Sequence, residues 1–308
     1  VSLSGAAATY TTSSGTQSSS SESFTFKVND GTTDSATATI NFDLRTDPLY
    51  QYQWHLNNTG QTNFASNGGT SGHDLNVDAV INVGLDGTGV VVAVVDSGLE
   101  LAHEDLSANI IANKSWDYVN EDLDPSPSGT TGDHGTSVAG IIGAVGWNKL
   151  GGRGVAPNVG LVGYNYMAAR GASNQANALG NGNSLSTSAG VDIFNLSYGT
   201  ALTSSFGVAL NSTVEAALLN GVTNYRGGKG AIYVNSAGND FYDGVDTNSD
   251  GDDDTAYYCG ATYASSSSAA AQLMPCWDAS FDPMFATPYI IGVGSLMAKS
   301  SGYTTSPL

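Results

Sequence analysis

The 308-residue sequence has little positive charge. It carries 9 Lys and Arg against 28 Asp and Glu, which gives a formal net charge of −19. Nucleic acid is therefore excluded as the expected partner, because its phosphates need Lys and Arg. The same shortage gives no support for binding to an anionic membrane surface. Only 12% of the residues are charged, most of these are acidic, and the chain is rich in Gly, Ser, Thr and Asn. Such a composition is typical of secreted or cell-surface bacterial proteins. The alternative is an acidic cytoplasmic protein.

Cysteine and long apolar runs are also scarce. Cys259 and Cys276 are the two cysteines, and both a disulfide that closes a surface loop and a pair of free thiols remain open. No apolar run approaches the roughly 20 residues that span a bilayer. The sequence begins with Val1 and has no recognisable signal peptide. We therefore expect it to have been cut from a longer protein.

The N-terminal part has the pattern of a β-hairpin. Apolar and polar residues alternate from Phe24 to Val28 and again from Ala36 to Phe42, with the turn sequence Asn-Asp-Gly between the two runs. This segment resembles the last two strands of a bacterial cadherin-like or Ig-like repeat. Two strands cannot form a sandwich core alone. We expect residues 1–44 to be a partial β-sandwich repeat and a linker.

From residue 45 onwards, short apolar runs alternate with helical patterns. Residues 135–145 and 206–220 have the composition or the spacing of helices. The apolar runs lie at 89–95, 160–164, 191–196, 231–235 and 289–293. This alternation predicts an α/β fold, a doubly wound and mostly parallel sheet with helices on both faces. In such a sheet the active site lies beyond the carboxyl ends of the strands.

Three polar residues stand where such a site is expected. Asp96 directly follows one apolar strand, His134 begins a helical stretch, and Asn239 follows another strand. A lone Asp at a strand end is most often a turn or cap residue. The order Asp, His, Asn, in these contexts, favours a serine-peptidase site instead.

Five sequence blocks resemble the subtilisin/kexin-type serine endopeptidases (subtilases, peptidase family S8), and the furin-like proprotein convertases are the most similar branch. The blocks are Asp47–Gly60, Val94–Leu106, His134–Gly140, Asn195–Gly199 and Ser236–Asn239. The resemblance covers roughly residues 47–308, and we expect a peptidase domain over 45–308. It implies a secreted, calcium-dependent serine endopeptidase that acts on polypeptides and has a subtilisin-like fold.

The resemblance assigns a role to each catalytic residue. His134 would be the general base, Asp96 would orient and stabilise its imidazole, and Asn239 would donate a hydrogen bond to the oxyanion. The family's nucleophile lies in a Gly-Thr-Ser-(small)₃-Pro block, and no such block follows Asn239 in this sequence. We therefore expect the chain to be incomplete at its C-terminus and inactive as given, whereas the full gene product hydrolyses peptide bonds. The alternative is a non-catalytic adhesion or binding module with a degenerate subtilase domain.

The resemblance also implies calcium, which takes six to eight oxygen ligands. One family site maps onto Asp47, Asp105, Val145, Asn148, Leu150 and Gly152, with several ligands from backbone carbonyls. A second maps onto Asp117, Asp122 and Asp124, for which a solvated acidic loop is the alternative. A third acidic stretch at 246–254 begins with EF-hand-like spacing but has Tyr257 at the twelfth position. Calcium and a plain solvated loop remain open there.

The walls of the substrate pocket map onto two segments by the same resemblance. They are Ser197, Tyr198 and Gly199, and Ser236, Ala237 and Gly238. This chain departs from the convertases because Ser97 replaces a second acid after Asp96, and no acid follows Gly199 in 200–202. Asp282 is the one acid that falls where convertases place an S1 carboxylate. We expect broad specificity with some preference for a basic P1 residue.

Overall fold

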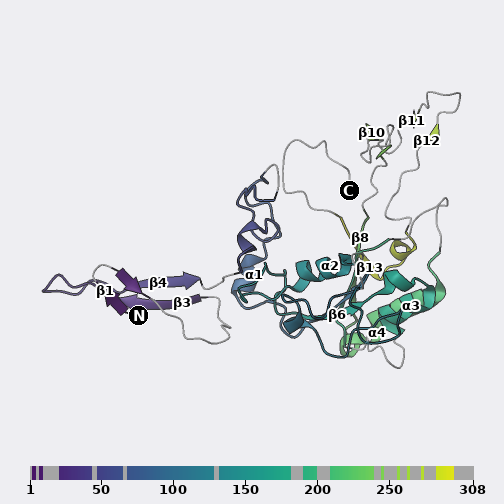
Figure 1. Cartoon of the computed structure of the whole chain (residues 1–308), viewed down its shortest axis with the longest axis horizontal. Helices are drawn as coiled ribbons and strands as arrows, with labels where there is room; N and C mark the ends of the chain where they lie inside the picture. The colour runs from purple at the N-terminus through teal and green to yellow at the C-terminus, as the bar shows by residue number, and fades with distance from the viewer. Residues whose placement is uncertain are drawn as a thin grey trace.

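Figure 1 shows the protein as a computed structural model. The described residues are 2–4, 7–9, 21–43, 47–64, 68–127, 132–181, 190–199, 209–238 and 282–294, together with four two-residue strands. Those short strands are β9 (Gly244–Val245), β10 (Thr255–Ala256), β11 (Thr262–Tyr263) and β12 (Gln272–Leu273), paired β9 with β10 and β11 with β12. Among the described residues, no helix has the length and apolar character of a membrane span.

The main body is an α/β unit. Its strands are β5 (Val91–Val95), β6 (Gly160–Tyr164), β7 (Ile193–Leu196), β8 (Ile232–Ser236) and β13 (Ile290–Val293). Its α-helices are α1 (Asp78–Asn82), α2 (His134–Gly143), α3 (Ala172–Ala176) and α4 (Ser212–Gly228). Short helical turns complete it: η1 (Tyr50–Tyr52), η2 (Ser107–Asn109), η3 (Tyr166–Ala169), η4 (Asn177–Asn181) and η6 (Pro283–Ala286). Each apolar run predicted to be a strand coincides with one to within a few residues.

The five strands form one parallel sheet in the order β13-β8-β7-β5-β6. The chain runs from β5 outwards to β6, and then returns to the other side of β5 to continue through β7, β8 and β13. The direction of the strand order therefore reverses at β5. Such a switch point opens a crevice at the carboxyl ends of the strands. Asp96 directly follows β5, so the fold places this carboxylate at the switch point.

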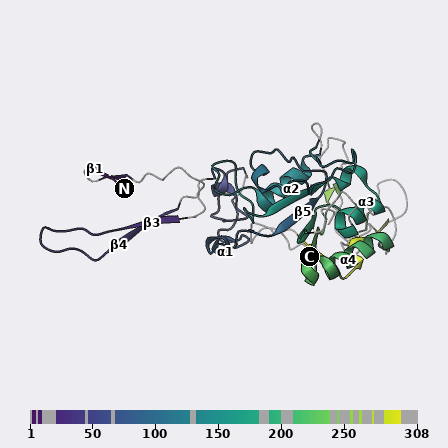
Figure 2. The same cartoon turned by 90° about the horizontal axis from the view of Figure 1, so that it is seen from below.

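Helices cover both faces of the sheet, as predicted (Figures 1 and 2). Side chains alternate between the two faces of a strand. In β5, Val92 and Val94 pack in a cluster that contains Ala139 of α2. Ala93 and Val95 pack in the cluster on the opposite face, together with residues of α3 and α4. The sheet is thus buried on both sides, which explains why β5 is apolar throughout.

The N-terminal residues form antiparallel pairs outside this body (Figure 2). β3 (Ser21–Phe26) pairs with β4 (Ala38–Asp43), with Phe24 opposite Ile40. β1 (Ser2–Ser4) pairs with β2 (Ala7–Thr9). The turn between β3 and β4 is fixed by Asp30, whose carboxylate accepts from the backbone N–H of Thr32 and of Thr33 at 2.8 and 2.9 Å. The predicted hairpin is present, and the wider repeat remains a prediction.

Candidate active site

Asp96 is held rigidly at the end of β5. Its side chain is fully buried. Its backbone N–H donates to the carbonyl of Tyr164 at 2.9 Å, and its own carbonyl accepts from the N–H of Met167 at 3.0 Å. Both neighbours belong to or follow β6. The sheet therefore continues to pair for one residue beyond β5, and this fixes the position of the carboxylate.

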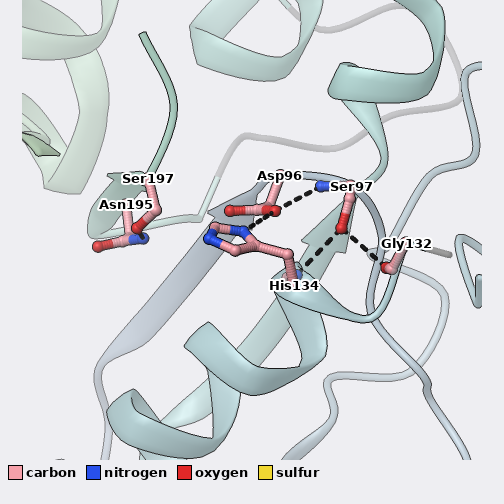
Figure 3. A network of polar contacts seen from close by, with 7 residues as sticks. Asp96, Ser97, Gly132, His134, Asn195 and Ser197 are labelled. Carbon is pink, nitrogen blue, oxygen red and sulfur yellow. Dashed lines mark hydrogen bonds and ion pairs between the residues drawn. The ribbon is translucent and has the colours of Figure 1, made fainter. Parts of the chain in front are cut away.

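His134 is the first residue of α2, and its ring lies against this carboxylate (Figure 3). The distance from His134 Nδ1 to Asp96 Oδ1 is 2.7 Å. The histidine side chain is 57% exposed, while that of Asp96 is 0% exposed. Because a buried carboxylate faces Nδ1, the proton of the neutral ring belongs on Nδ1 and Nε2 remains an acceptor. This is the state of a general base that is oriented by an acid.

Glycines allow the segment after β5 to approach α2. A Cβ at Gly135 would lie 2.1 Å from the carbonyl oxygen of Gly98 and 2.9 Å from Cβ of Asp96. Gly98 itself has φ of +136°, and a Cβ there would lie 2.5 Å from the carbonyl oxygen of Pro125. Neither position has room for a side chain. The two glycines in Asp-Ser-Gly and His-Gly are thus explained by close contact between backbones.

Ser97 connects the same two segments. Its N–H donates to Asp96 Oδ1 at 2.6 Å. Its hydroxyl donates to the carbonyl of Gly132 at 2.8 Å and accepts from the N–H of Gly135 at 3.1 Å (Figure 3). In the sequence, Ser97 differs from the convertase pattern, and its hydrogen bonds become evident only in the structure.

The two predicted pocket walls begin where the neighbouring strands β7 and β8 end, at the carboxyl ends of the sheet. Residues 197–199 follow β7 and residues 236–238 lie at the end of β8, which pairs with β7 in parallel. The buried Asn235 amide, with its nitrogen oriented towards them, donates to the carbonyls of Leu196 and Tyr198 at 2.7 and 3.1 Å. Asn195 also donates to Ser197 Oγ at 3.0 Å. These contacts fix the first wall against β8.

Asp282 lies beside this wall. It is buried, and its Oδ1 accepts from the N–H of Met284 at 2.8 Å at the start of η6. A Cβ built on Gly199 would be 3.5 Å from Asp282 Oδ2. The pKa of Tyr166 is raised mainly by burial, and the negative charge of Asp282 adds to this. The structure thus brings together the weakly aligned acid and the wall that the resemblance assigned to S1.

The first predicted calcium cluster is gathered around two buried carboxylates. Asn148 joins them, because its N–H donates to Asp47 Oδ1 at 3.1 Å and its side-chain amide donates to Asp105 Oδ1 at 2.6 Å. The N–H of Val145 donates to the carbonyl of Asp105 at 2.8 Å. Leu150 N–H donates to Asn148 Oδ1 at 2.8 Å. Residues 145–151 therefore lie against these acids, whereas the neighbour of Gly152 is the side chain of Gln53.

Arg153 is a buried cation at this cluster that the sequence analysis missed. It is 0% exposed, and its Nε lies 2.9 Å from Asp47 Oδ2. Its guanidinium carbon lies 3.8 Å from the ring centroid of Tyr50. A lone Arg next to a glycine-rich stretch gives no sequence signal of burial. Only the packing of η1 against residues 145–153 reveals it.

The pKa of Asp105 is raised from 3.8, first by burial. The hydrogen bond from Asn148 lowers it, and the charge of Asp47 raises it again. Arg153 compensates Asp47 directly, whereas the Asp105 carboxylate accepts from the neutral amide of Asn148, and the charge of His103 lowers its pKa to a smaller extent. The structure brings two carboxylates together here, and carboxylate oxygens are ligands that a hard cation takes.

The second predicted cluster is arranged differently. Asp117 Oδ1 accepts from the N–H groups of Val119 and Asn120 at 2.6 and 3.1 Å and from Asn165 Nδ2 at 2.5 Å. Asn120 Nδ2 donates to Asp117 Oδ2 at 2.8 Å. Burial raises the pKa of Asp117, but these hydrogen bonds outweigh it, and the net pKa is lowered.

The other two acids of that cluster bind backbone. Asp122 Oδ1 accepts from the N–H of Asp124, and Asp124 Oδ1 accepts from the N–H of Ser126. Within the described ranges, no three His, Cys, Asp or Glu side chains gather as a metal site. The hydrogen-bonding capacity of Asp117 is therefore already used by the protein.

Several predicted residues lie outside the described residues. They are Asn239, the acidic stretch 246–254, Tyr257, the two cysteines and residues 200–202. The roles assigned to them remain predictions.

Comparison with known proteins settles the family. The model of the Subtilase family (Peptidase_S8) matches residues 87–306. The chain belongs to the subtilase family. Its sheet and helices match subtilase structures, as the crystal structure of a serine protease of Aeromonas sobria shows with a TM-score of 0.58 and 35% identity. That match covers 65% of this chain and 34% of the other.

Relatives of this subtilase include an extracellular serine protease of Aeromonas sobria. It is 46% identical over 107 residues, which are 35% of this chain and 17% of the relative. A dibasic-processing endoprotease of Schizosaccharomyces pombe is 32% identical over 193 residues, 63% of this chain and 25% of the relative. Neuroendocrine convertase 2 of Homo sapiens is 39% identical over 111 residues, 35% of this chain and 17% of the relative. The chain thus spans a quarter or less of the length of these relatives.

The close approach of Gly135 to Gly98 can be tested by substitution. We expect Gly135→Ala to lower the free energy of unfolding by about 1–3 kcal/mol or more, because the new methyl group meets backbone that cannot move independently. Gly140→Ala is the matched control in the same helix, since a Cβ there has nothing within 4 Å. It should be neutral or stabilise by up to about 1 kcal/mol. Denaturant unfolding measures both, and equal effects of the two substitutions would contradict this account.

Proposed function

We propose that the complete protein is a secreted, calcium-dependent serine endopeptidase, to which this chain contributes the general base and its orienting acid. The observation that carries the proposal is the 2.7 Å contact between His134 Nδ1 and the buried Asp96. It lies at the switch point of a subtilase sheet. The family match supports a hydrolase that acts on polypeptides.

The geometry supports a defined proton path. His134 Nε2 takes the proton from a serine hydroxyl as that oxygen attacks the peptide carbonyl, and it later gives the proton to the leaving amine. The Asp96 carboxylate stabilises the imidazolium that forms between these steps. Asn239 would donate its side-chain N–H to the oxyanion. Water has access to His134 but not to Asp96, which suits a base that exchanges protons and an acid that does not.

The proposal does not identify a serine nucleophile within this chain. The 308 residues contain no Gly-Thr-Ser-(small)₃-Pro block after Asn239. We infer that the complete gene product supplies it. The alternative is a non-catalytic adhesion module, which the resemblance of the N-terminal hairpin to a cadherin-like or Ig-like repeat would favour.

We also propose a preference for a basic P1 residue. Asp282 lies beside Gly199 in the predicted wall of S1, and a buried carboxylate there would pair with Lys or Arg. One relative is named a dibasic-processing endoprotease. Ser97 cannot supply the negative charge that convertases place after the catalytic Asp. We therefore expect some preference for a basic residue at P1 and a weaker preference for Lys at P2 than in the convertases.

We propose that calcium binds at Asp47, Asp105 and Asn148, with carbonyl oxygens of the segment 145–152. When bound, the ion would stabilise the fold by adding positive charge to a buried acidic cluster. The pKa of Asp105 is raised first by burial and further by the charge of Asp47, and a bound cation would offset both effects. The ion would complement Arg153, which already pairs with Asp47. Calcium at Asp117, Asp122 and Asp124 remains a prediction with less support, since Asp117 is saturated by hydrogen bonds.

Secretion of the protein is part of the proposal. An extracellular serine protease of Aeromonas sobria is among its relatives, and the acidic, low-charge composition is consistent with that compartment.

The peptidase proposal is tested by comparing the 308-residue chain with the complete gene product. We expect the complete protein to contain the serine block, to react with a fluorophosphonate probe and to hydrolyse denatured protein. Asp96→Asn should keep the fold but lower kcat by about 10⁴, because the amide reverses the tautomer preference of His134. A complete gene product without the block and without labelling would favour the adhesion module.

The role of Asp282 is tested with peptides that differ only at P1. In the complete protein, Asp282→Asn should lower kcat/KM for P1 Arg by about thirtyfold, as expected when one partner of a buried charge pair is removed. The P1 Leu peptide is the internal control and should be little affected. Asn can still accept from the N–H of Met284, so η6 keeps its cap. Equal losses for both peptides would show that Asp282 is structural.

Calcium binding is tested by thermal unfolding of the chain with calcium and with chelator. At about 100 times Kd, calcium should stabilise by about 2.7 kcal/mol, which raises Tm by several degrees. Asp105→Asn should abolish this shift, and Asp122→Asn should retain it. Loss of the shift in Asp122→Asn alone would move the site to the second cluster, and no shift in the unchanged chain would contradict the proposal.

A further inference from the structure

We propose that Ser97 is a positioning residue. It keeps His134 aligned with Asp96 because its hydroxyl, just after β5, caps the N-terminus of α2. The inference rests on the proposed function of that pair. It assigns to Ser97 a role that neither the family match nor the relatives assign.

The first turn of α2 needs an external acceptor. The first N–H groups of a helix have no partner within it and are usually bonded by the side chain of the N-cap residue. In α2 the N-cap is Asp133, and its side chain makes no such bond. Ser97 Oγ accepts from the N–H of Gly135 instead, at 3.1 Å. The cap therefore comes from a residue 38 positions away in the sequence.

Both hydrogen bonds of this side chain need a hydroxyl group, which can donate and accept at the same time. Ser97 Oγ donates its proton to the carbonyl of Gly132 at 2.8 Å, which leaves its lone pairs for Gly135. A carboxylate at this position could accept from Gly135, but it would repel the Gly132 carbonyl. An apolar side chain would satisfy neither group. This distinguishes Ser97 from the acid that convertases carry here.

A second hydrogen bond joins the same two segments in the opposite direction. Thr136 Oγ1, in the first turn of α2, accepts from the N–H of Glu100 at 3.0 Å. Each segment thus bonds an amide of the other through a hydroxyl. A capping box does the same within one helix terminus. Here the two halves come from the strand that carries the acid and from the helix that carries the base.

Ser97 also contacts the acid itself. Its N–H donates to Asp96 Oδ1 at 2.6 Å, and this is the oxygen that faces His134 Nδ1. One residue therefore fixes the carboxylate oxygen through its backbone and the start of the histidine helix through its side chain. If the hydroxyl is removed, Asp96 and His134 keep their chemistry but lose their common support.

The test reads the His134–Asp96 bond directly by NMR of the full chain. The Nδ1 proton of His134 should give a low-field resonance, which His134→Gln assigns by its loss. In Ser97→Ala we expect the exchange of this proton with water to become about tenfold faster, as for the loss of one hydrogen bond. Ser97→Thr keeps a hydroxyl and should restore the slow exchange.

Ser126→Ala is the matched control. Ser126 Oγ also connects an N–H and a carbonyl, those of Leu101 and Leu99, at 3.2 and 3.4 Å. Neither of its partners belongs to α2. This substitution should leave the His134 resonance unchanged.

A folded Ser97→Ala chain with the exchange rate of the unchanged chain would overturn the proposal. If Ser97→Ala does not fold, hydrogen exchange of the Gly135 amide in the unchanged chain decides, because exchange at the rate of an unstructured glycine would exclude the cap. These readouts need no peptidase activity. A complete protein without activity would contradict the proposed function and leave the positioning role supported.

Discussion

The site depends on the contact between the end of β5 and the first turn of α2. The carbonyl of Gly98 lies so close to Gly135 that no side chain fits between them. With the two segments this close, His134 Nδ1 lies 2.7 Å from Asp96 Oδ1. Backbone contact fixes distance but not orientation. The hydroxyls of Ser97 and Thr136 add direction, because each bond aligns one segment with an amide of the other.

Buried negative charge is the second constraint, and the fold compensates it differently at each place. Asp96 receives a histidine and a backbone amide. Asp117 receives four neutral donors. Asp47 is paired with Arg153, one of only 9 cationic Lys and Arg residues in the chain. Since isolated charges are costly to bury, carboxylates with weak compensation, such as Asp105, are where ligands are expected.

Much of the fold and part of the site could be predicted. The apolar runs gave the five strands because a sheet buried on both faces needs nearly continuous apolar residues. Asp96 and His134 could be paired because of their ordered sequence blocks. Asp282 could be named from the resemblance to the convertases, and its place beside Gly199 came from the structure. Arg153 could not be predicted, because its burial depends on Tyr50 and Asp47, about 100 residues earlier.

The sequence by itself determined the family, the strands, the helix that begins at His134 and the identity of the acid and base. These follow from local patterns, in which each residue type reports its immediate surroundings. The tertiary structure decided which groups meet. It made Ser97 a cap for a helix 38 residues away, and it used the hydrogen-bonding capacity of Asp117 within the protein while leaving Asp105 with fewer donors. Hydrogen bonds and ion pairs act over a few ångströms, and only the folded chain brings such distant segments that close.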